Sequence, residues 1–462
     1  MGHPVQEEWG QKALHTMAED RGKDMDSIWD GVEMPAFGGL ERDCRTDVLI
    51  IGGGMTGLLC AHLLGQAGVD CLLVEAGRLC GGVTGRTTAK VTVQHGMVYH
   101  RLMKRWGEAA GRLYLEANRQ ALEQYRSLCR DWDCDWEEQE SWCYTTREGR
   151  TARQEAQALA QLGVEVRLTQ SLPLPVPVTG AVGVPGQAQI HPLKLAARLA
   201  EGKRILEHTR IEALHPGRAV AAGGTIFAER VVVATHFPFL NTRGGYFLKL
   251  YQHRSYVVAL EGAEMPDGMY VEEGEDGLSF RRYGPWLLLG GGGHRTGHPG
   301  DGWQVLEDFT RQHWPQARVV SRWATQDCMT LDGVPYIGRY SPRTPDLYVA
   351  TGYNKWGMTS SMVAATLLTH LIVGQDSPYT RLFAPDRPLS LSPLLANSGA
   401  AAVGLLTPTI PRCPHMGCAL RRNGVEGSWD CPCHGSRFGA NGHLINNPAT
   451  GSLRTHLHRD NP

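Results

Sequence analysis

The stretch DVLIIGGGMTG, from Asp47 to Gly57, decides the fold class of this chain. Its first five residues are mostly branched and apolar, which is typical of a buried parallel strand. They lead directly into glycines at the spacing G-x-G-x-x-G, namely Gly52, Gly54 and Gly57. Such glycines allow a tight turn, a close approach of the backbone to a pyrophosphate, and close packing of the following helix. The stretch therefore predicts a strand, a turn and a helix whose free N–H groups bind phosphates.

The residues that follow extend this unit. Leu58 to Ala67 have helical apolar spacing, and Val69 to Val74 read as a second strand that ends in Glu75. An acid just over twenty residues after the first glycine suits a ribose hydroxyl and argues against a 2′-phosphate. The alternative is an ordinary strand-turn-helix unit, because the chain holds 56 glycines. The position of the acid favours a dinucleotide site in an α/β, Rossmann-like domain.

A glycine- and threonine-rich segment, CGGVTGRTTAKVTVQHG from Cys80 to Gly96, helps to choose the dinucleotide. A simple nicotinamide unit would continue with another helix and strand, whereas this segment lies directly beyond the ribose acid. It favours FAD. A later strand, RVVVA from Arg230 to Ala234, leads into His236 and is predicted to return to the same sheet beside the cofactor.

Composition narrows the class of partner. Charged residues make up 20% of the chain, and its formal net charge of −1 gives no electrostatic reason to expect nucleic acid. We expect a small-molecule substrate or another redox protein instead. The start of the chain is polar, and no window approaches the ~18 unbroken apolar residues that span a bilayer. We therefore expect a cytoplasmic protein without a transmembrane segment.

Four of the twelve cysteines form two short clusters near the C-terminus, CPHMGC and CPCHGS. Taking Cys413, His415, Cys431 and His434 as ligands gives C-x-H followed by C-x-x-H. A Rieske [2Fe–2S] centre needs two thiolates on one iron and two imidazoles on the other. Zinc also accepts two cysteines and two histidines, although zinc sites seldom place histidine two residues after the first cysteine. A degenerate module without a cluster is the remaining alternative.

Longer segments resemble the D-amino-acid oxidase and sarcosine oxidase superfamily of flavoproteins, the DAO family. They cover roughly residues 45 to 385 and lie in the family's order: DVLIIGGGMTGLLCAHLL, VEAGRLCGGVTGRTTAK, IHPLKLAARLA, VVVATHFPF, LDGVPYIGRY and VATGYNKWGMTSSM. The resemblance implies a discontinuous FAD domain and an α+β substrate domain with an antiparallel sheet. It also implies oxidation of a carbon–nitrogen or carbon–oxygen bond by hydride transfer to the flavin.

This resemblance assigns roles to particular residues. GRTTAK, from Gly85 to Lys90, is expected along one face of the flavin ring, and the turn from Thr351 to Thr359 is expected at its pyrimidine end. A helix dipole there would stabilise the anionic reduced flavin. The expected FAD-binding residues are Gly52, Gly54, Met55, Thr56, Gly57, Glu75, Ala76, Arg78, Thr84, Arg86, Thr87, Thr88, Ala234, Thr235, Gly352, Gly357, Met358 and Thr359.

Candidates for the substrate pocket are Arg281, Tyr283, His294 and Lys355. An arginine could clamp a substrate carboxylate, and a histidine or lysine could accept a proton from an amine. For each of them a solvated or packing side chain is the alternative.

The two C-terminal clusters are similar to the cluster loops of Rieske proteins. The resemblance extends to Cys418 and Cys433, which in one branch of that family form a disulfide. Ser436 matches a hydroxyl that hydrogen-bonds a bridging sulfide, whereas Phe438 stands where high-potential members have tyrosine. We therefore expect a midpoint potential below that of respiratory-type proteins. The module is short for a Rieske domain, so the cluster is expected to rest on the flavoprotein body for shelter or to be labile.

The expected division of the chain has four parts: an N-terminal arm at 1–44, a DAO-type body at 45–383, a linker at 384–411 without a lasting helical period, and a small all-β Rieske module at 412–462. The whole chain is similar to bacterial FAD-dependent oxidoreductases of this layout. A helix is expected between Trp106 and Arg130.

The main functional hypothesis is a dehydrogenase of a small amine or amino-acid-like substrate. Hydride goes to FAD, and single electrons then pass to the Rieske cluster and an external acceptor such as a ferredoxin. Electron flow could also run in the opposite direction, or the cluster could act as a redox sensor without catalysis. A Rieske-type oxygenase would need a mononuclear iron with two histidines and a carboxylate. His95 and His100 have a suitable spacing but no acid three residues earlier.

Overall fold

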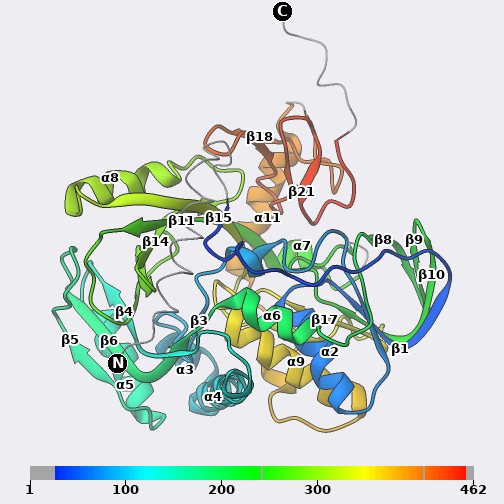
Figure 1. The fold of residues 1–462 in the computed structure, drawn as a ribbon, viewed down its shortest axis with the longest axis horizontal. Helices are drawn as coiled ribbons and strands as arrows, with labels where there is room; N and C mark the ends of the chain where they lie inside the picture. The colour runs from blue at the N-terminus through cyan, green and yellow to red at the C-terminus, as the bar shows by residue number, and fades with distance from the viewer. Residues whose placement is uncertain (1–25, 241–242, 409–410, 454–462) are drawn as a thin grey trace, which may run out of the picture.

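The computed structural model describes residues 26–240, 243–408 and 411–453 (Figure 1). Three sheets organise these residues: a largely antiparallel sheet at the left of Figure 1, a largely parallel sheet at the right and a small sheet at the top. None of the helices in the described ranges is both long and apolar enough to cross a membrane.

The parallel sheet has eight strands and is centred on β1 (Cys44–Ile51). Its main order is β16-β17-β10-β1-β2-β7, and the β8–β9 hairpin extends β10. Leu49 and Ile50 of β1 are fully buried, as expected for a strand covered on both faces. The other strands are β2 (Cys71–Val74), β7 (Ile205–Leu206), β8 (Ile211–His215), β9 (Arg218–Ala221), β10 (Gly224–Val233), β16 (Tyr336–Arg339) and β17 (Leu347–Thr351).

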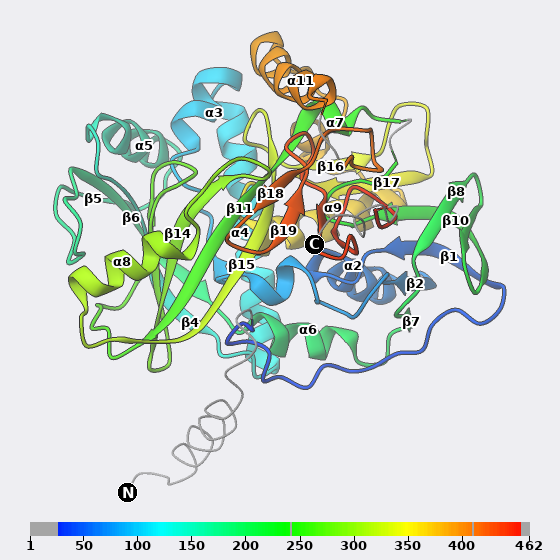
Figure 2. The same ribbon diagram turned by 90° about the horizontal axis from the view of Figure 1, so that it is seen from above.

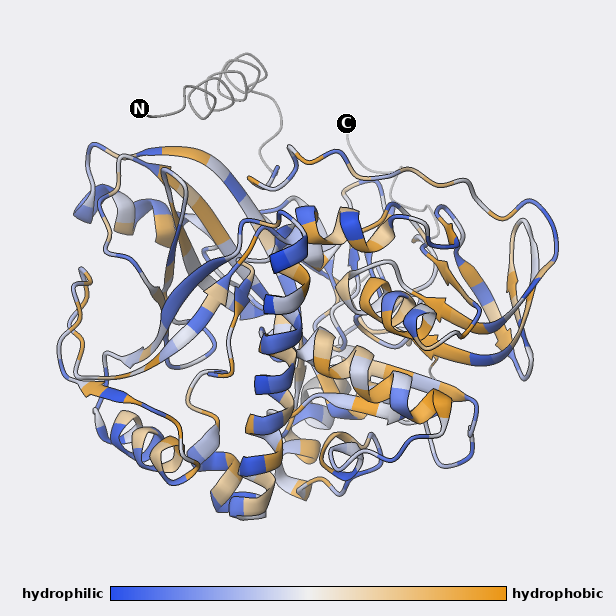
Figure 3. Cartoon of the chain, turned by 60° about the horizontal axis from the view of Figure 1, so that its bottom comes forward, coloured by the Kyte–Doolittle hydropathy of each residue, from blue (hydrophilic) through white to orange (hydrophobic). Residues whose placement is uncertain are grey.

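Helices α2 (Met55–Gln66) and α9 (Gly357–Val373) pack against each other beside this sheet. Figure 3 shows hydrophobic residues along the strands and helices of this half of the molecule. The strand, turn, helix and strand predicted from Asp47 to Glu75 are confirmed, and so is the return of residues 230–233 to the same sheet, where β10 pairs with β1.

The second sheet has nine strands in the main order β15-β11-β14-β13-β12-β4-β6-β3, with β5 on β6. Neighbours are antiparallel except for β12 and β4. The strands are β3 (Lys90–Val91), β4 (Glu137–Thr145), β5 (Arg167–Thr169), β6 (Gly180–Gln189), β11 (Leu250–Glu261), β12 (Met269–Glu272), β13 (Ser279–Tyr283), β14 (Trp286–Arg295) and β15 (Arg318–Thr330).

The remaining helices surround these sheets (Figure 2). The predicted helix between Trp106 and Arg130 is confirmed as α4 (Glu108–Asp131). The others are a short 3₁₀ helix (Val83–Arg86), α3 (Tyr99–Trp106), α5 (Arg150–Gln161), α6 (Pro192–Ala200), α7 (Tyr246–Lys249), α8 (Trp303–His313), α10 (Thr380–Phe383) and α11 (Leu391–Leu406).

Helix α11 corrects the expectation that residues 384–411 lack a helical period. Pro393 lies in its first turn, where the missing N–H has no intrahelical partner to lose. Gly404 allows the helix to approach the C-terminal module, because a Cβ atom there would lie 2.6 Å from Cys433 Sγ. Packing therefore stabilises a helix that was not expected from a composition rich in proline, serine and glycine.

The C-terminal sheet has four antiparallel strands: β18 (Arg421–Asn423), β19 (Ser428–Asp430), β20 (Arg437–Phe438) and β21 (Leu444–Asn446). Most of the N-terminal arm lies outside the described residues. Its described part crosses the body at Trp29, which is fully buried and donates through Nε1 to the carbonyl of Thr87 at 2.8 Å. Asp30 pairs with Arg86 at 2.8 Å.

Candidate functional site

The glycine-rich turn has the geometry that its spacing predicted. Gly52 has a φ of +115°, and a Cβ atom on it would lie 2.5 Å from the carbonyl oxygen of Ala234. A Cβ atom on Gly57 would overlap the carbonyl oxygen of Gly52, so only glycine lets α2 begin so close to β1. Helix α2 has no side-chain cap from Gly54, so the N–H groups of its first turn other than that of Met55 are available to a phosphate.

Glu75 is held at the end of β2 by two backbone donors. Its Oε2 atom accepts from the Gly53 N–H at 2.8 Å, and its Oε1 atom accepts from the Gly77 N–H at 2.8 Å. The Met55 N–H donates to Thr84 Oγ1 at 3.0 Å and ties the turn to the segment after β2. The predicted ribose acid thus lies against the predicted phosphate-binding turn.

A cavity of about 1660 Å³ opens beside this turn and runs between the two large sheets. It exceeds the roughly 300–1,000 Å³ of a drug-sized site, so it has room for a dinucleotide and a substrate. All of the predicted FAD-binding residues line it except Gly57 and Thr359. Gly57 packs α2, and Thr359 Oγ1 contacts His95 Nε2 at 2.7 Å. The cavity wall and the glycine turn fit FAD.

The turn before α9 forms one end of this cavity. Asn354 and Lys355 both have left-handed φ angles, +51° and +73°, and α9 then begins at Gly357 without a side-chain cap. Trp356 stacks on His95 with ring centroids 5.1 Å apart. The first N–H groups of α9 are therefore positioned at the cavity wall, where a helix dipole stabilises negative charge.

His95 and His100 do not form an iron site. Burial lowers the pKa of His95 to about 3, and its ring contacts Tyr114, Thr92 and Thr359. The Nδ1 atom of His100 instead contacts Glu155 Oε2 at 2.8 Å. The two rings are occupied by separate partners, which removes the basis for the oxygenase alternative.

Of the four predicted substrate residues, only Lys355 lines the cavity. Its Nζ atom donates to the carbonyl of Glu275. Arg281 donates to the carbonyls of Thr88, Ile190 and Arg282, so it supports the GRTTAK segment and is not a carboxylate clamp.

Tyr283 and His294 also lie away from the cavity wall. The Tyr283 hydroxyl donates to Asp135 Oδ2 at 2.6 Å, and His294 Nε2 contacts the Tyr256 hydroxyl at 3.0 Å. The substrate roles expected for these two residues are therefore not supported by their positions.

Two cavity residues escaped the sequence analysis as candidates. Lys90 Nζ donates to Thr88 Oγ1 at 3.1 Å, and burial together with the nearby Arg281 lowers its pKa to about 7. Asp327 accepts from Ser255 Oγ at 3.3 Å, and burial raises its pKa. Lys90 is the last residue of the GRTTAK motif, so its position beside the flavin could be predicted from the sequence. That no carboxylate of the described residues pairs with it could not be predicted. Nothing in the residues around Asp327 signals a cavity.

The four predicted cluster ligands meet in the C-terminal module. Cys413 and Cys431 are buried, and the rings of His415 and His434 lie 4.9 Å apart. Burial lowers the pKa of His415 to about 4 and that of His434 to about 3, so both imidazoles are neutral, as iron ligands must be. A hydrogen bond with Cys431 lowers the pKa of the Cys413 thiol to about 7.

This donor set fits a Rieske cluster. Within the described part of the chain, neither ring nitrogen of His434 has a hydrogen-bond partner, although both are buried. Cys418 and Cys433 form the disulfide that the resemblance implied. The sulfur atoms of Cys418, Cys431 and Cys433 all lie within 4.8 Å of one another, so the disulfide packs directly against a ligand thiol.

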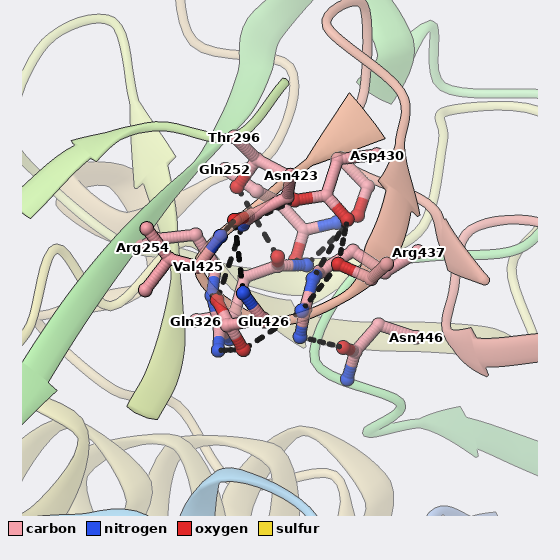
Figure 4. Close-up of polar contacts among 12 residues, drawn as sticks. Gln252, Arg254, Thr296, Gln326, Asn423, Val425, Glu426, Asp430, Arg437 and Asn446 are labelled. Atoms are coloured by element: carbon pink, nitrogen blue, oxygen red, sulfur yellow. Dashed lines mark hydrogen bonds and ion pairs between the residues drawn. The ribbon is translucent and has the colours of Figure 1, made fainter. Parts of the chain in front are cut away.

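A buried ionic network fixes the module on the body (Figure 4). Arg254 of β11 donates to both carboxylate oxygens of Glu426, at 3.0 and 2.5 Å. Arg437 of β20 donates to the same carboxylate at 2.8 Å and to Asp430 at 3.0 Å. Burial raises the pKa of Glu426, but the two guanidinium groups outweigh it, and the net shift is downward.

Further contacts lie beside the cluster histidine. Gln252 of β11 donates to the carbonyls of His434 and Asn447 at 2.8 and 3.0 Å. The His434 ring also packs edge-on against Phe237 and Phe247 of the body. Asn447 in turn donates to the carbonyl of Thr235, a predicted FAD contact, at 2.6 Å. One ligand of the predicted cluster therefore faces the flavoprotein body.

This fold and these two sites define a flavoprotein oxidoreductase with an iron–sulfur module. The family described as FAD dependent oxidoreductase, DAO, matches residues 47–371, and the chain belongs to it. The Rieske [2Fe-2S] domain matches residues 404–456. FAD and a [2Fe–2S] cluster are therefore its cofactors.

Similar proteins agree with this assignment. The chain is 32% identical to the putative Rieske 2Fe-2S iron-sulfur protein YhfW of Bacillus subtilis (strain 168), over 91% of this chain and 95% of that one. It is 25% identical to gamma-glutamylputrescine oxidoreductase of Escherichia coli (strain K12), over 73% of this chain and 86% of that one. The structure of glycine oxidase from Geobacillus kaustophilus matches with a TM-score of 0.64 at 21% identity, covering 75% of this chain and 100% of that one, and shows the shared fold.

Proposed function

We propose that the protein is a dehydrogenase of a small amine or amino-acid-like substrate that passes electrons to an external acceptor through its Rieske cluster. FAD supplies hydride acceptance and the cluster supplies one-electron transfer. The acceptor is proposed to be a redox protein such as a ferredoxin, and the setting is proposed to be the cytoplasm. On this proposal the body spans 45–383 and the module 412–462, with α11 inside the segment between them.

One observation carries the proposal: the flavin cavity and the module share a wall. Residues 443–447 together with Ala449 and Thr450 line the same cavity as the predicted FAD-binding residues. Asn447 bridges the two directly through its hydrogen bond to the Thr235 carbonyl. A module placed there supports electron exchange with the flavin, and a simple oxidase would need no cluster.

Cavity residues outside the cofactor turn support an amine as the substrate. Lys90 has a pKa of about 7 and donates to Thr88 Oγ1, which suits a group that takes the proton of a substrate ammonium. Asp327 and Ser255 lie in the same wall and offer acceptors to an amine. The names of the Escherichia coli relative and of the glycine oxidase structure point to the same substrate class.

The test is anaerobic reduction of the purified holoenzyme by candidate amines and amino acids. We expect one of them to bleach the flavin absorbance and to produce the low-temperature electron paramagnetic resonance signal of a reduced Rieske cluster. The Cys431→Ser variant should still show flavin bleaching but should not reduce a ferredoxin. Reduction of the flavin by a reduced ferredoxin, without any bleaching by amines, would favour the opposite direction of electron flow.

Iron content provides an independent check. Two irons per chain and a Rieske-type signal after dithionite reduction are expected. A silent protein that still holds FAD would leave an ordinary amine-type flavoenzyme with a degenerate or zinc-binding tail. A redox sensor would show the cluster signal but no turnover with any substrate.

A further inference from the structure

Helix α11 presents one apolar face to solvent. Five of its large side chains are exposed, by between 42% and 82% of their surface: Leu391, Leu395, Val403, Leu405 and Leu406. At 100° per residue these positions share one side of a helix. The opposite side is buried, where Asn397 donates to the carbonyls of Leu248 and Leu250 and Gly404 contacts the disulfide.

An arginine lies at each end of α11. Arg412 donates to the carbonyls of Leu405 and Thr407, at 3.3 and 2.7 Å, and so lies at the C-terminal end of α11. Arg105 of α3 donates to Ser390 Oγ at 3.2 Å, at the N-terminal end. Helix α3 adds two exposed cations, Arg101 and Lys104, and contains no acid.

The same bias continues along the chain. Residues 388–425 contain three arginines and neither aspartate nor glutamate. The nearest preceding acid is Asp386, and the nearest following acid, Glu426, is buried in the ion-pair network.

Both helices, α3 and α11, contribute residues to the cavity wall. The wall includes Arg101, Arg105 and Trp106 of α3 and Pro393 and Ala396 of α11. The Arg105–Ser390 hydrogen bond joins α3 to the residue before α11, and Figure 2 shows both helices toward the top of the view. The helix with the apolar stripe and the basic helix α3 thus both border the flavin cavity.

We propose that α11 and α3 form a membrane-docking surface that places this side of the flavin cavity against an anionic lipid bilayer. An interfacial helix lies in the headgroup region with its apolar side chains buried, and nearby arginine and lysine side chains bind anionic headgroups. Helix α11 has 16 residues and so lies along the surface rather than across the bilayer. The proposal is independent of the substrate and of the direction of electron flow.

A second copy of the chain fits this surface less well. Self-association through it would bring the basic residues of two identical faces together, and like charges oppose such contacts. Five exposed apolar side chains are also few against the roughly 20–30 residues that each partner contributes to a stable interface.

Vesicle flotation of the full-chain holoenzyme tests the proposal. We expect the protein to float with vesicles of phosphatidylglycerol and phosphatidylcholine, to stay at the bottom of the gradient with phosphatidylcholine alone, and to be released by salt. No flotation with the anionic vesicles would overturn the proposal. A dimer in size-exclusion chromatography that Leu406→Glu dissociates would also overturn it, in favour of a second copy.

Matched variants locate the surface. Leu391→Glu and Leu406→Glu should each lower the bound fraction about tenfold, because each removes an apolar side chain and adds a repelled charge. Leu168→Glu is the control, because Leu168 is 51% exposed on β5, outside this surface, and should leave flotation unchanged. Lys104→Gln, which disturbs no apolar contact of α11, should weaken binding about fivefold. Wild-type flotation by all of the surface variants, with FAD content preserved, would refute the assignment.

Discussion

At Gly57, the absence of a side chain decides whether the dinucleotide turn can form. A methyl group there would overlap the Gly52 carbonyl, and the first turn of α2 would have to move away from β1. We predict that Gly57→Ala loses bound FAD and destabilises the protein by roughly 1–3 kcal/mol, the usual cost of overpacking. Flavin absorbance and thermal unfolding measure both effects. Gly65→Ala on the same helix is the control, since its Cβ atom would meet only Lys203 Nζ, at 3.8 Å.

The side chain at position 438 is expected to influence the midpoint potential of the cluster. It is fully buried on β20, directly after the loop that carries Cys431 and His434. A hydroxyl at this position would offer the hydrogen bond that high-potential Rieske proteins make to the cluster, and hydrogen bonds to sulfur raise the potential.

Phe438→Tyr is therefore predicted to raise the midpoint potential by roughly 20–65 mV, the equivalent of one hydrogen bond for a one-electron couple. A redox titration followed by electron paramagnetic resonance measures it. An unchanged or lower value with an intact signal would contradict the prediction.

Sequence alone predicted the local geometry of residues that lie close together in the chain. Gly52 and Glu75 belong to one local unit of strand, turn, helix and strand, so their spacing in the sequence predicts how they lie relative to each other. Arg281 is different, because its acceptors Thr88 and Ile190 come from other segments. A buried arginine that supports carbonyls and one that binds substrate have the same local sequence.

At the scale of elements, α11 is the helix that composition concealed. Residues 384–411 contain several prolines, serines and glycines, which are weak helix formers, and the helix depends on contacts with the body and the disulfide. By contrast, the apolar residues of β1, α2 and α4 have the pattern of a strand or a helix, so the sequence predicted each of these elements.

Substitutions at two glycines of α11 distinguish the effect of helix propensity from the effect of packing against the module. Gly399 has open space around its Cβ position, so Gly399→Ala is predicted to stabilise α11 by about 0.5–1 kcal/mol. A Cβ atom on Gly404 would lie 2.6 Å from Cys433 Sγ, so Gly404→Ala is predicted to destabilise the module. Hydrogen-exchange rates of the α11 amides in the two variants measure both effects. Equal effects of both changes would mean that the contact with the disulfide does not hold the helix.

At the scale of the whole molecule, a shared buried carboxylate joins the two cofactor units. From the short length of the module, the sequence predicted that the cluster either rests on the body or is labile, but it did not predict which residues make the contact. Arg254 and Gln252 read as ordinary polar residues of a strand, and only the assembled sheet brings them to Glu426 and His434.

Glu426→Gln is predicted to undock the module at a cost of roughly 3–5 kcal/mol, because it leaves the Arg254 and Arg437 charges buried without full compensation. Limited proteolysis and hydrogen exchange of residues 421–437 measure undocking. Glu108→Gln is the control: its exposed pair with Arg112 should contribute less than about 1 kcal/mol.

The same carboxylate sets a pH dependence. The pKa of Glu426 in the folded protein lies below its ordinary value of 4.5. The ion pairs of Glu426 with Arg254 and Arg437 therefore stabilise docking fully above about pH 4.5, and this stabilisation is lost as the pH falls through the lowered pKa. Wild type should therefore undock in acid below about pH 4.5. Glu426→Gln should lack this step, and an unchanged acid transition in the variant would assign it to other groups.

The parallel sheet takes its strands from far apart along the chain, with β1 at Cys44–Ile51 and β17 at Leu347–Thr351. During synthesis, the glycine-rich turn after β1 therefore leaves the ribosome some three hundred residues before the turn that precedes α9 at the other end of the cavity. The flavin cannot be enclosed until α9 has emerged, and the predicted cluster cysteines, Cys413 and Cys431, are translated after it. All of the predicted FAD-binding residues therefore leave the ribosome before the predicted cluster ligands do.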